Sequence, residues 1–151
     1  MGKHFLMSMR FNKSSPEDFG LVKINGKVVN PCDKSEWERM ELYDFGWGKE
    51  NGYVKLPVPV FSELINIVSY SRDKEDMYGA AALILDLYTD DLLHFCESTF
   101  IDKDKIKSYK QMIEILSLRE CVNRCSTVGK TCEEIISDYS RWKQIADILN
   151  G

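Results

Sequence analysis

The sequence contains one pair of residues with the spacing of an acid–base pair. Asp90 and His94 are four residues apart, so on a helix the carboxylate could orient the imidazole as a general base requires. No nucleophile motif such as Gly-x-Ser-x-Gly accompanies the pair. Similar pairs occur in structural ion-pair networks. We therefore expect this pair to form a surface ion pair or to cap a helix, and we predict no catalytic residues.

A second short motif is typical of phosphate binding. Gly129-Lys130-Thr131 matches the end of a phosphate-binding loop, in which the backbone amides of a glycine-rich turn enclose the phosphates. That loop requires a glycine five residues before Gly129, where this sequence has Arg124. Thr131 and Glu134 match a capping box instead. We expect a helix to begin here and predict no nucleotide cofactor.

The cysteines could bind a metal ion, because thiolates bind zinc tightly. Cys121, Cys125 and Cys132 are the closest in sequence, and His94 or Cys96 would have to complete the site from a distance. A structural zinc site usually has paired short spacings such as Cys-x-x-Cys, which this sequence lacks. The five cysteines also lack the regular spacing of a secreted disulfide framework. We predict reduced thiols, no metal, no cofactor and a cytoplasmic location.

Acidic residues concentrate in the middle of the chain. Residues 59–96 contain seven Asp or Glu, opposed by Arg72 and Lys74. They do not follow the alternating pattern of a calcium loop. A solvated face is one interpretation of such a charge run, and a surface for a basic partner is the other. The residues that we assign to a partner-binding acidic face are Asp76, Asp86, Asp90 and Asp91.

Aromatic residues cluster between positions 37 and 53, among three glycines. Aromatic side chains anchor protein interfaces because they bury a large area at a low entropy cost. They could equally seal a sheet against neighbouring helices. The candidate partner-binding residues of this aromatic loop are Trp37, Tyr43, Trp47 and Tyr53.

The first third of the chain has the patterns of β structure. Apolar residues alternate over residues 4–11, which predicts a strand. Asn25-Gly26 separates two short candidate strands, 21–23 and 27–29, and this dipeptide is a strong hairpin signal. Ser35 and Glu38 match a capping box and predict a short helix over residues 36–43, ended by the glycines at 46, 48 and 52. Residues 53–56 are a further candidate strand.

The remainder of the chain has helical periodicity. Helices are expected over residues 60–70, with Pro59 in the first turn, and over 77–88, where the pattern is apolar nearly all round. Thr89, Asp90 and Asp91 offer N-cap chemistry for the next helix, and Asp102 for the one after it. The last helix should follow Thr131, with an apolar stripe that consists of Ile135, Tyr139, Trp142, Ala146 and Leu149.

Length and composition indicate the number of domains, and the patterns described above indicate the fold class. The 151 residues, 44% hydrophobic and 29% charged, suit one globular domain over 1–151. We predict an α+β fold: a small N-terminal antiparallel sheet with one short helix over 1–58, and a bundle of about five antiparallel helices over 59–151. The longest apolar run, residues 77–85, is too short to span a membrane, and residues 1–10 are not expected to act as a secretion signal.

Charge indicates which partners to expect. A net charge of −4 repels phosphate backbones and anionic membranes, so we expect no nucleic-acid or membrane partner. The leading hypothesis is a non-enzymatic protein-interaction module, most concretely a bacterial immunity-type or antitoxin-like inhibitor that covers the basic groove of a toxin with its acidic face. One alternative is a small-ligand binder or enzyme with a pocket between the sheet and the helices. The other is a homo-oligomeric structural domain.

Overall fold

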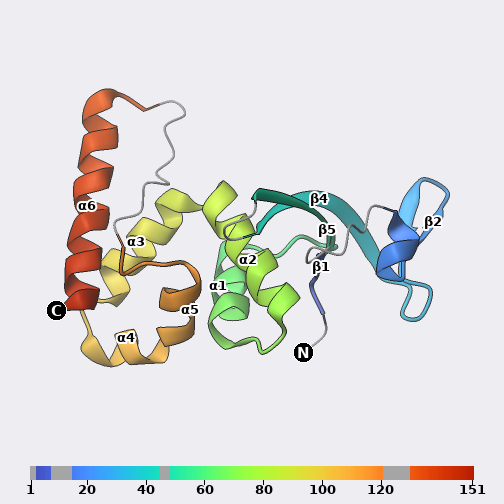
Figure 1. Cartoon of the computed structure of the whole chain (residues 1–151), viewed down its shortest axis with the longest axis horizontal. Helices are drawn as coiled ribbons and strands as arrows, with labels where there is room; N and C mark the ends of the chain where they lie inside the picture. Colours follow the sequence, from blue (N-terminus) through green and yellow to red (C-terminus); the bar gives the residue numbers. More distant parts are fainter. Residues whose placement is uncertain (1–2, 8–14, 45–47, 121–129) are drawn as a thin grey trace. The chain divides into compact units, whose positions relative to one another are not determined.

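The fold is α+β, as the sequence predicted (Figure 1). The computed structural model describes residues 3–7, 15–44, 48–120 and 130–151. The chain forms two compact units, Met1–Leu83 and Ile84–Gly151, and the division falls inside one helix. We call them the sheet unit and the helical unit and describe each by itself. The expectation of a single domain stays a prediction.

The sheet unit contains a five-stranded antiparallel sheet with the strand order β1-β5-β4-β3-β2. Strand β1 occupies part of the predicted strand, and residues 8–14 lie outside the described residues. One short 3₁₀ helix, η1 (Pro16–Phe19), precedes β2. The strands are β1 (Phe5–Met7), β2 (Val22–Ile24), β3 (Lys27–Val29), β4 (Glu36–Asp44) and β5 (Gly48–Lys55).

The predicted Asn25-Gly26 hairpin is confirmed. Ile24 pairs with Lys27, so the turn between β2 and β3 has two residues. Both of these residues have positive φ, 51° for Asn25 and 79° for Gly26. This is the backbone geometry that a type I′ turn requires, and it explains why Asn and Gly occupy the two positions.

The predicted helix over residues 36–43 is wrong, because this segment is strand β4. The strand pairs with β3 through Val28 and Trp37, and with β5 over eight residue pairs from Trp37–Lys55 to Asp44–Gly48. Ser35 does not act as a helix cap, since its hydroxyl donates to Asp33 and accepts from Trp37 Nε1. An isolated eight-residue helix is marginal in water. Pairing on two edges therefore outweighs the local capping signal, and the glycines at 48 and 52 lie within β5 instead of ending a helix.

Both faces of the sheet carry buried side chains. On one face Phe5 and Val54 are fully buried, and Phe5 packs against Gly79 of helix α2 (Lys74–Leu87). On the other face Trp37 and Tyr53 form a small cluster with Leu21. Helix α1 (Phe61–Tyr70) precedes α2, with Val60 at its N-cap, so Pro59 lies just before the helix and not in its first turn.

The helical unit contains the end of α2 and four further helices among the described residues. Their bounds are α3 (Thr89–Thr99), α4 (Lys103–Ser108), α5 (Lys110–Ile115) and α6 (Cys132–Asn150). Asp102 caps α4 through the N–H of Asp104, and Thr131 with Glu134 forms the predicted capping box of α6. Thr89, Asp90 and Asp91 lie in the first turn of α3, whose N-cap is Tyr88.

The core of the helical unit is formed by apolar residues from all of its helices except α4. Trp142 of α6 is the largest of them and is 1% exposed. Within the described part of the chain, no helix has both the length and the apolar character needed to cross a membrane. The other buried core residues include Ile84, Leu92, Leu93, Cys96, Phe100, Met112, Ile113, Leu116, Leu118, Ile145, Ala146 and Leu149.

Candidate functional site

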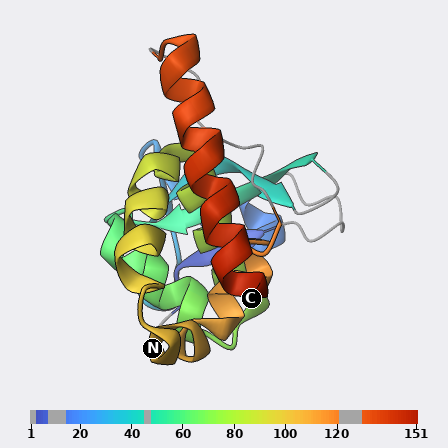
Figure 2. The ribbon, with the colours of Figure 1, turned by 90° about the vertical axis from the view of Figure 1, so that its left-hand side faces the viewer.

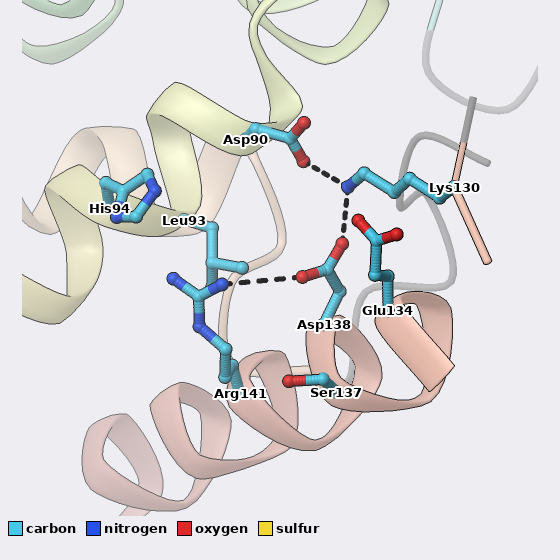
Figure 3. A pocket seen from close by; sticks show the side chains of 8 residues that line it. All are labelled: Asp90, Leu93, His94, Lys130, Glu134, Ser137, Asp138 and Arg141. Carbon is cyan, nitrogen blue, oxygen red and sulfur yellow. Dashed lines mark hydrogen bonds and ion pairs between the residues drawn. The ribbon is translucent and has the colours of Figure 1, made fainter. Parts of the chain in front are cut away.

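Helices α3 and α6 lie side by side in the helical unit (Figures 1 and 2), and a charged cleft opens between them. The cleft has a volume of about 320 Å³. Its lining side chains are polar or charged apart from Leu93, as Figure 3 shows. They are Asp90, Leu93 and His94 of α3, Lys130, and Glu134, Ser137, Asp138 and Arg141 of α6.

Asp138 is the central carboxylate of the cleft and is 8% exposed. Lys130 Nζ donates to Asp138 Oδ2, and it also donates to Asp90 Oδ1 at 2.6 Å. These hydrogen bonds raise the pKa of Lys130 above its ordinary value of 10.5. Lys130 therefore remains charged and joins α3 to α6 by bridging one exposed and one buried carboxylate.

Arg141 forms the second bridge between the two helices. Its Nε donates to Glu97 Oε2 at 2.9 Å and its Nη2 donates to Glu97 Oε1. Its Nη1 also contacts Asp138 Oδ1 at 3.4 Å. Hydrogen bonds from Arg141 lower the pKa of Glu97, and those to Glu97 raise the pKa of Arg141. Paired in this way, both groups stay ionised over a wide pH range.

The predicted pairing of Asp90 with His94 is replaced by two other contacts. The Asp90 carboxylate binds Lys130, and His94 Nδ1 lies 3.9 Å from Glu97 Oε1. His94 is exposed on the rim of the cleft. Both residues line the same cleft, but the described contacts do not orient the imidazole through Asp90.

The charge of the cleft is negative. Its two cations, Lys130 and Arg141, each bind two carboxylates. The carboxylate of Glu134 also lines the cleft and accepts from the N–H of Thr131 at 3.3 Å. Since the positive groups are already paired, the cleft has little free positive charge with which to attract an anion, and a cationic group suits it better.

Three of the four residues assigned to the predicted acidic face are exposed. Asp86 is exposed at the end of α2, and Asp90 and Asp91 are exposed in the first turn of α3. Leu87, between them in the sequence, is 58% exposed. We call these four residues, Asp86, Leu87, Asp90 and Asp91, the junction surface.

Asp76 has a different environment. It is 4% exposed, and its Oδ1 accepts from the backbone N–H of His4 at 2.9 Å and of Phe5 at 2.8 Å. The pKa of Asp76 is raised, chiefly by burial and also by the charge of Asp73, although the two hydrogen bonds lower it. Glu75 similarly accepts from the N–H of Met7. The two carboxylates cover the N–H groups of β1, an edge strand of the sheet, so we leave Asp76 out of the junction surface.

The candidate aromatic residues are described in part. Trp37 and Tyr53 are 5% and 3% exposed and belong to the buried cluster with Leu21. The rings of Phe19 and Tyr53 pack edge to face, with their centroids 5.2 Å apart. Tyr43 lies in β4, and Trp47 is outside the described residues. Trp37 and Tyr53 are therefore buried within the sheet unit, and the residues packed against this cluster are Leu6, Phe19 and Val28, none of which belongs to an α-helix.

The candidate metal ligands are likewise described in part. Cys96 is buried and Cys132 is exposed, whereas Cys121 and Cys125 lie outside the described residues. Within the described ranges, no group of three His, Cys, Asp or Glu side chains is placed to hold a metal ion.

Sequence analysis missed the central residue of the cleft. The predicted stripe of α6 included Tyr139, which is 47% exposed, while its neighbour Asp138 is buried. A carboxylate at this position is compatible with burial because Lys130 and Arg141 neutralise it. The sequence signal that could have found it is its spacing: Asp138 is four residues before the buried Trp142 and three before Arg141, so a helix places all three on one face.

Comparisons of the chain with protein-family models, with curated proteins and with solved structures found no significant match.

Proposed function

We propose that this protein is a non-enzymatic interaction module that binds a basic protein partner through the junction surface and the adjoining cleft. Most concretely, it acts as an immunity-type or antitoxin-like inhibitor in the cytoplasm and covers a basic substrate groove of a toxin such as a nuclease. The observation that carries the proposal is the exposure of Asp86, Asp90 and Asp91 beside a cleft whose own cations are paired.

The chemistry of the junction surface supports a protein partner. The exposed carboxylates of Asp86 and Asp91, beside Asp90 whose charge Lys130 partly neutralises, create a negative potential that accelerates docking of a positively charged surface. The exposed Leu87 side chain adds an apolar contact among these charges. An apolar contact with a charged rim is the usual composition of a protein interface.

The proposal is tested by affinity capture with the tagged full chain from a lysate of the cells that produce it. The wild type is compared with the double variant Asp86→Lys/Asp91→Lys, which leaves the Asp90–Lys130 pair intact. The matched control is Glu114→Lys/Asp147→Lys, which makes the same charge change at exposed positions of α5 and α6. Each capture is performed at low and at high salt and analysed by mass spectrometry.

We expect one stoichiometric basic partner that the wild type and the control capture at low salt. High salt and the Asp86→Lys/Asp91→Lys change should both release it. If the partner is a toxin, adding the purified protein should inhibit its activity. Capture of the same partner by both double variants, or of no partner at either salt, would contradict the proposal.

One observation favours the alternative of a small-ligand binder or enzyme, although its cleft lies between α3 and α6 and not between the sheet and the helices. The cleft volume of about 320 Å³ is at the lower end of the range for ligand pockets, and His94 is on its rim. A thermal-shift screen of small cationic and neutral ligands tests this alternative. A saturable rise in melting temperature that His94→Ala abolishes would support it over the partner-binding function.

A further inference from the structure

Apolar burial holds the second half of α6, from Trp142 onward. Four of the apolar side chains there are at most 6% exposed, whereas Ile148 faces solvent. Arg119 also donates to the Leu149 carbonyl oxygen, and Asn150 Nδ2 donates to the Arg119 carbonyl oxygen at 2.7 Å. The buried residues of this half are Trp142, Ile145, Ala146 and Leu149.

The first half of α6, residues 132–141, has a different environment. Asp138 is its buried residue, Ile135 and Arg141 are half-buried, and the other seven are exposed. Figure 2 shows the first turns of this helix projecting past the end of α3. Its described charged contacts with α3 are the Lys130 bridge from Asp90 to Asp138 and the Arg141 pair with Glu97.

The two halves must therefore respond differently to salt. The side chains of Lys130 and Asp138 are only 14% and 11% exposed. The side chains of Asp90, Arg141 and Glu97 are 56%, 30% and 34% exposed, so water and ions reach the two pairs that join the helices, Asp90–Lys130 and Glu97–Arg141. Ion pairs of this kind are weak and are screened by salt. Apolar burial is not screened, and excluded salts strengthen it.

We propose that the first half of α6 is an electrostatic latch, which Lys130, Asp138 and Arg141 close onto Asp90 and Glu97 of α3. The latch opens when ions or a competing cation occupy these carboxylates, while the second half of α6 remains packed in the core. Opening separates the walls of the cleft and exposes its floor at Leu93, which is 1% exposed in the closed state. This inference is independent of the proposed function, because the latch needs no partner.

Hydrogen exchange of the full chain, followed by mass spectrometry in sodium chloride from about 0.05 M to about 1 M, tests the latch. Rates are normalised to the unfolded protein at each salt concentration. We expect backbone amides 136–141 to exchange about tenfold faster at high salt, since several screened pairs lose their stabilisation together. Amides 145–150 should keep their protection. Equal protection of residues 136–141 at all salt concentrations, or equal acceleration in both halves, would overturn the proposal.

Two variants locate the effect. Asp138→Asn removes the central charge and keeps the size and one acceptor oxygen, so at low salt it should exchange like the wild type at high salt. Asp147→Asn, at an exposed carboxylate of the second half, is the matched control and should not differ from the wild type. If Asp138→Asn fails to fold, Lys130→Met serves in its place. Wild-type protection and salt dependence in a folded variant would contradict the latch.

Discussion

Gly79 of α2 lies so close to Phe5 of β1 that a Cβ atom at position 79 would be 2.3 Å from the ring and 2.7 Å from Phe5 Cβ. Phe5 is fully buried, and its Cβ is fixed by the backbone of β1. The absence of a side chain at position 79 therefore sets how closely helix and strand approach within the sheet unit.

We expect Gly79→Ala to destabilise the protein, although alanine usually stabilises the interior of a helix relative to glycine by about 1 kcal/mol. The clash with Phe5 is an overpacking effect, which costs about 1–3 kcal/mol. Urea unfolding measures the change. In a double-mutant cycle, Phe5→Leu should recover part of the loss in the Gly79→Ala background. A Gly79→Ala protein more stable than the wild type would show that the contact is not tight.

Acid should weaken the helical unit through Glu97. Hydrogen bonds from Arg141 hold the pKa of Glu97 below its ordinary value of 4.5. A carboxyl with a lowered folded pKa stabilises the fold above its unfolded pKa, and this stabilisation is lost as the pH falls through the folded value. Between about pH 6 and about pH 3, the free energy of unfolding should fall less for Glu97→Gln than for the wild type.

The comparison of Glu97→Gln with the wild type isolates the contribution of Glu97. Other carboxyl groups also change the free energy of unfolding as the pH falls, some lowering it and others raising it. Burial raises the pKa of Asp73, but the hydrogen bonds that it accepts and the charge of Lys3 together lower it below its ordinary value. Protonation of Asp73 therefore destabilises the fold, as protonation of Glu97 does. Asp76 has a raised pKa and acts in the opposite direction. Glu114→Gln, at an exposed position, is the control and should follow the wild-type curve. Parallel curves for Glu97→Gln and the wild type would refute the prediction.

Trp37 should contribute to stability and not to partner binding. It is 5% exposed in the cluster with Leu21 and Tyr53, and its Nε1 donates to Ser35 Oγ at 2.8 Å. Truncation to alanine should cost about 3–5 kcal/mol, measured by urea unfolding. Trp37→Phe should cost less because it keeps the aromatic volume. An unchanged unfolding midpoint for Trp37→Ala, together with lost partner capture, would place this residue at an interface.

The described cysteines should differ in reactivity. Cys96 is 1% exposed and burial raises the pKa of its thiol, so little reactive thiolate forms. Cys32 and Cys132 are exposed. Brief treatment of the native protein with iodoacetamide should label Cys32 and Cys132, and Cys96 should be labelled only after unfolding. Peptide mapping by mass spectrometry measures the labelling, and rapid modification of native Cys96 would show that its region opens.

The candidate site was predictable only in part. Asp90 and His94 were recognised from their spacing, and both line the cleft. Lys130 was first considered as part of a phosphate-loop motif, and its amine instead binds Asp90, forty residues earlier in the chain. No periodicity within one helix encodes such a pair, because the partners come from different elements.

The sequence by itself determined the features that depend on only a few neighbouring residues. These are the Asn25-Gly26 turn, the Asp102 cap, and the capping box of Thr131 and Glu134. Each depends on backbone geometry or on a side chain that reaches a nearby N–H group. Those signals need no other part of the fold.

Only the tertiary structure decided the environments that depend on distant partners. The segment after Ser35 became strand β4 because β3 and β5 pair with its two edges. Asp76 became a buried acceptor for the N–H groups of His4 and Phe5, more than seventy residues away. A carboxylate or a strand gains most of its stabilisation from the groups that it meets after folding, and for these residues the groups come from elements far along the chain.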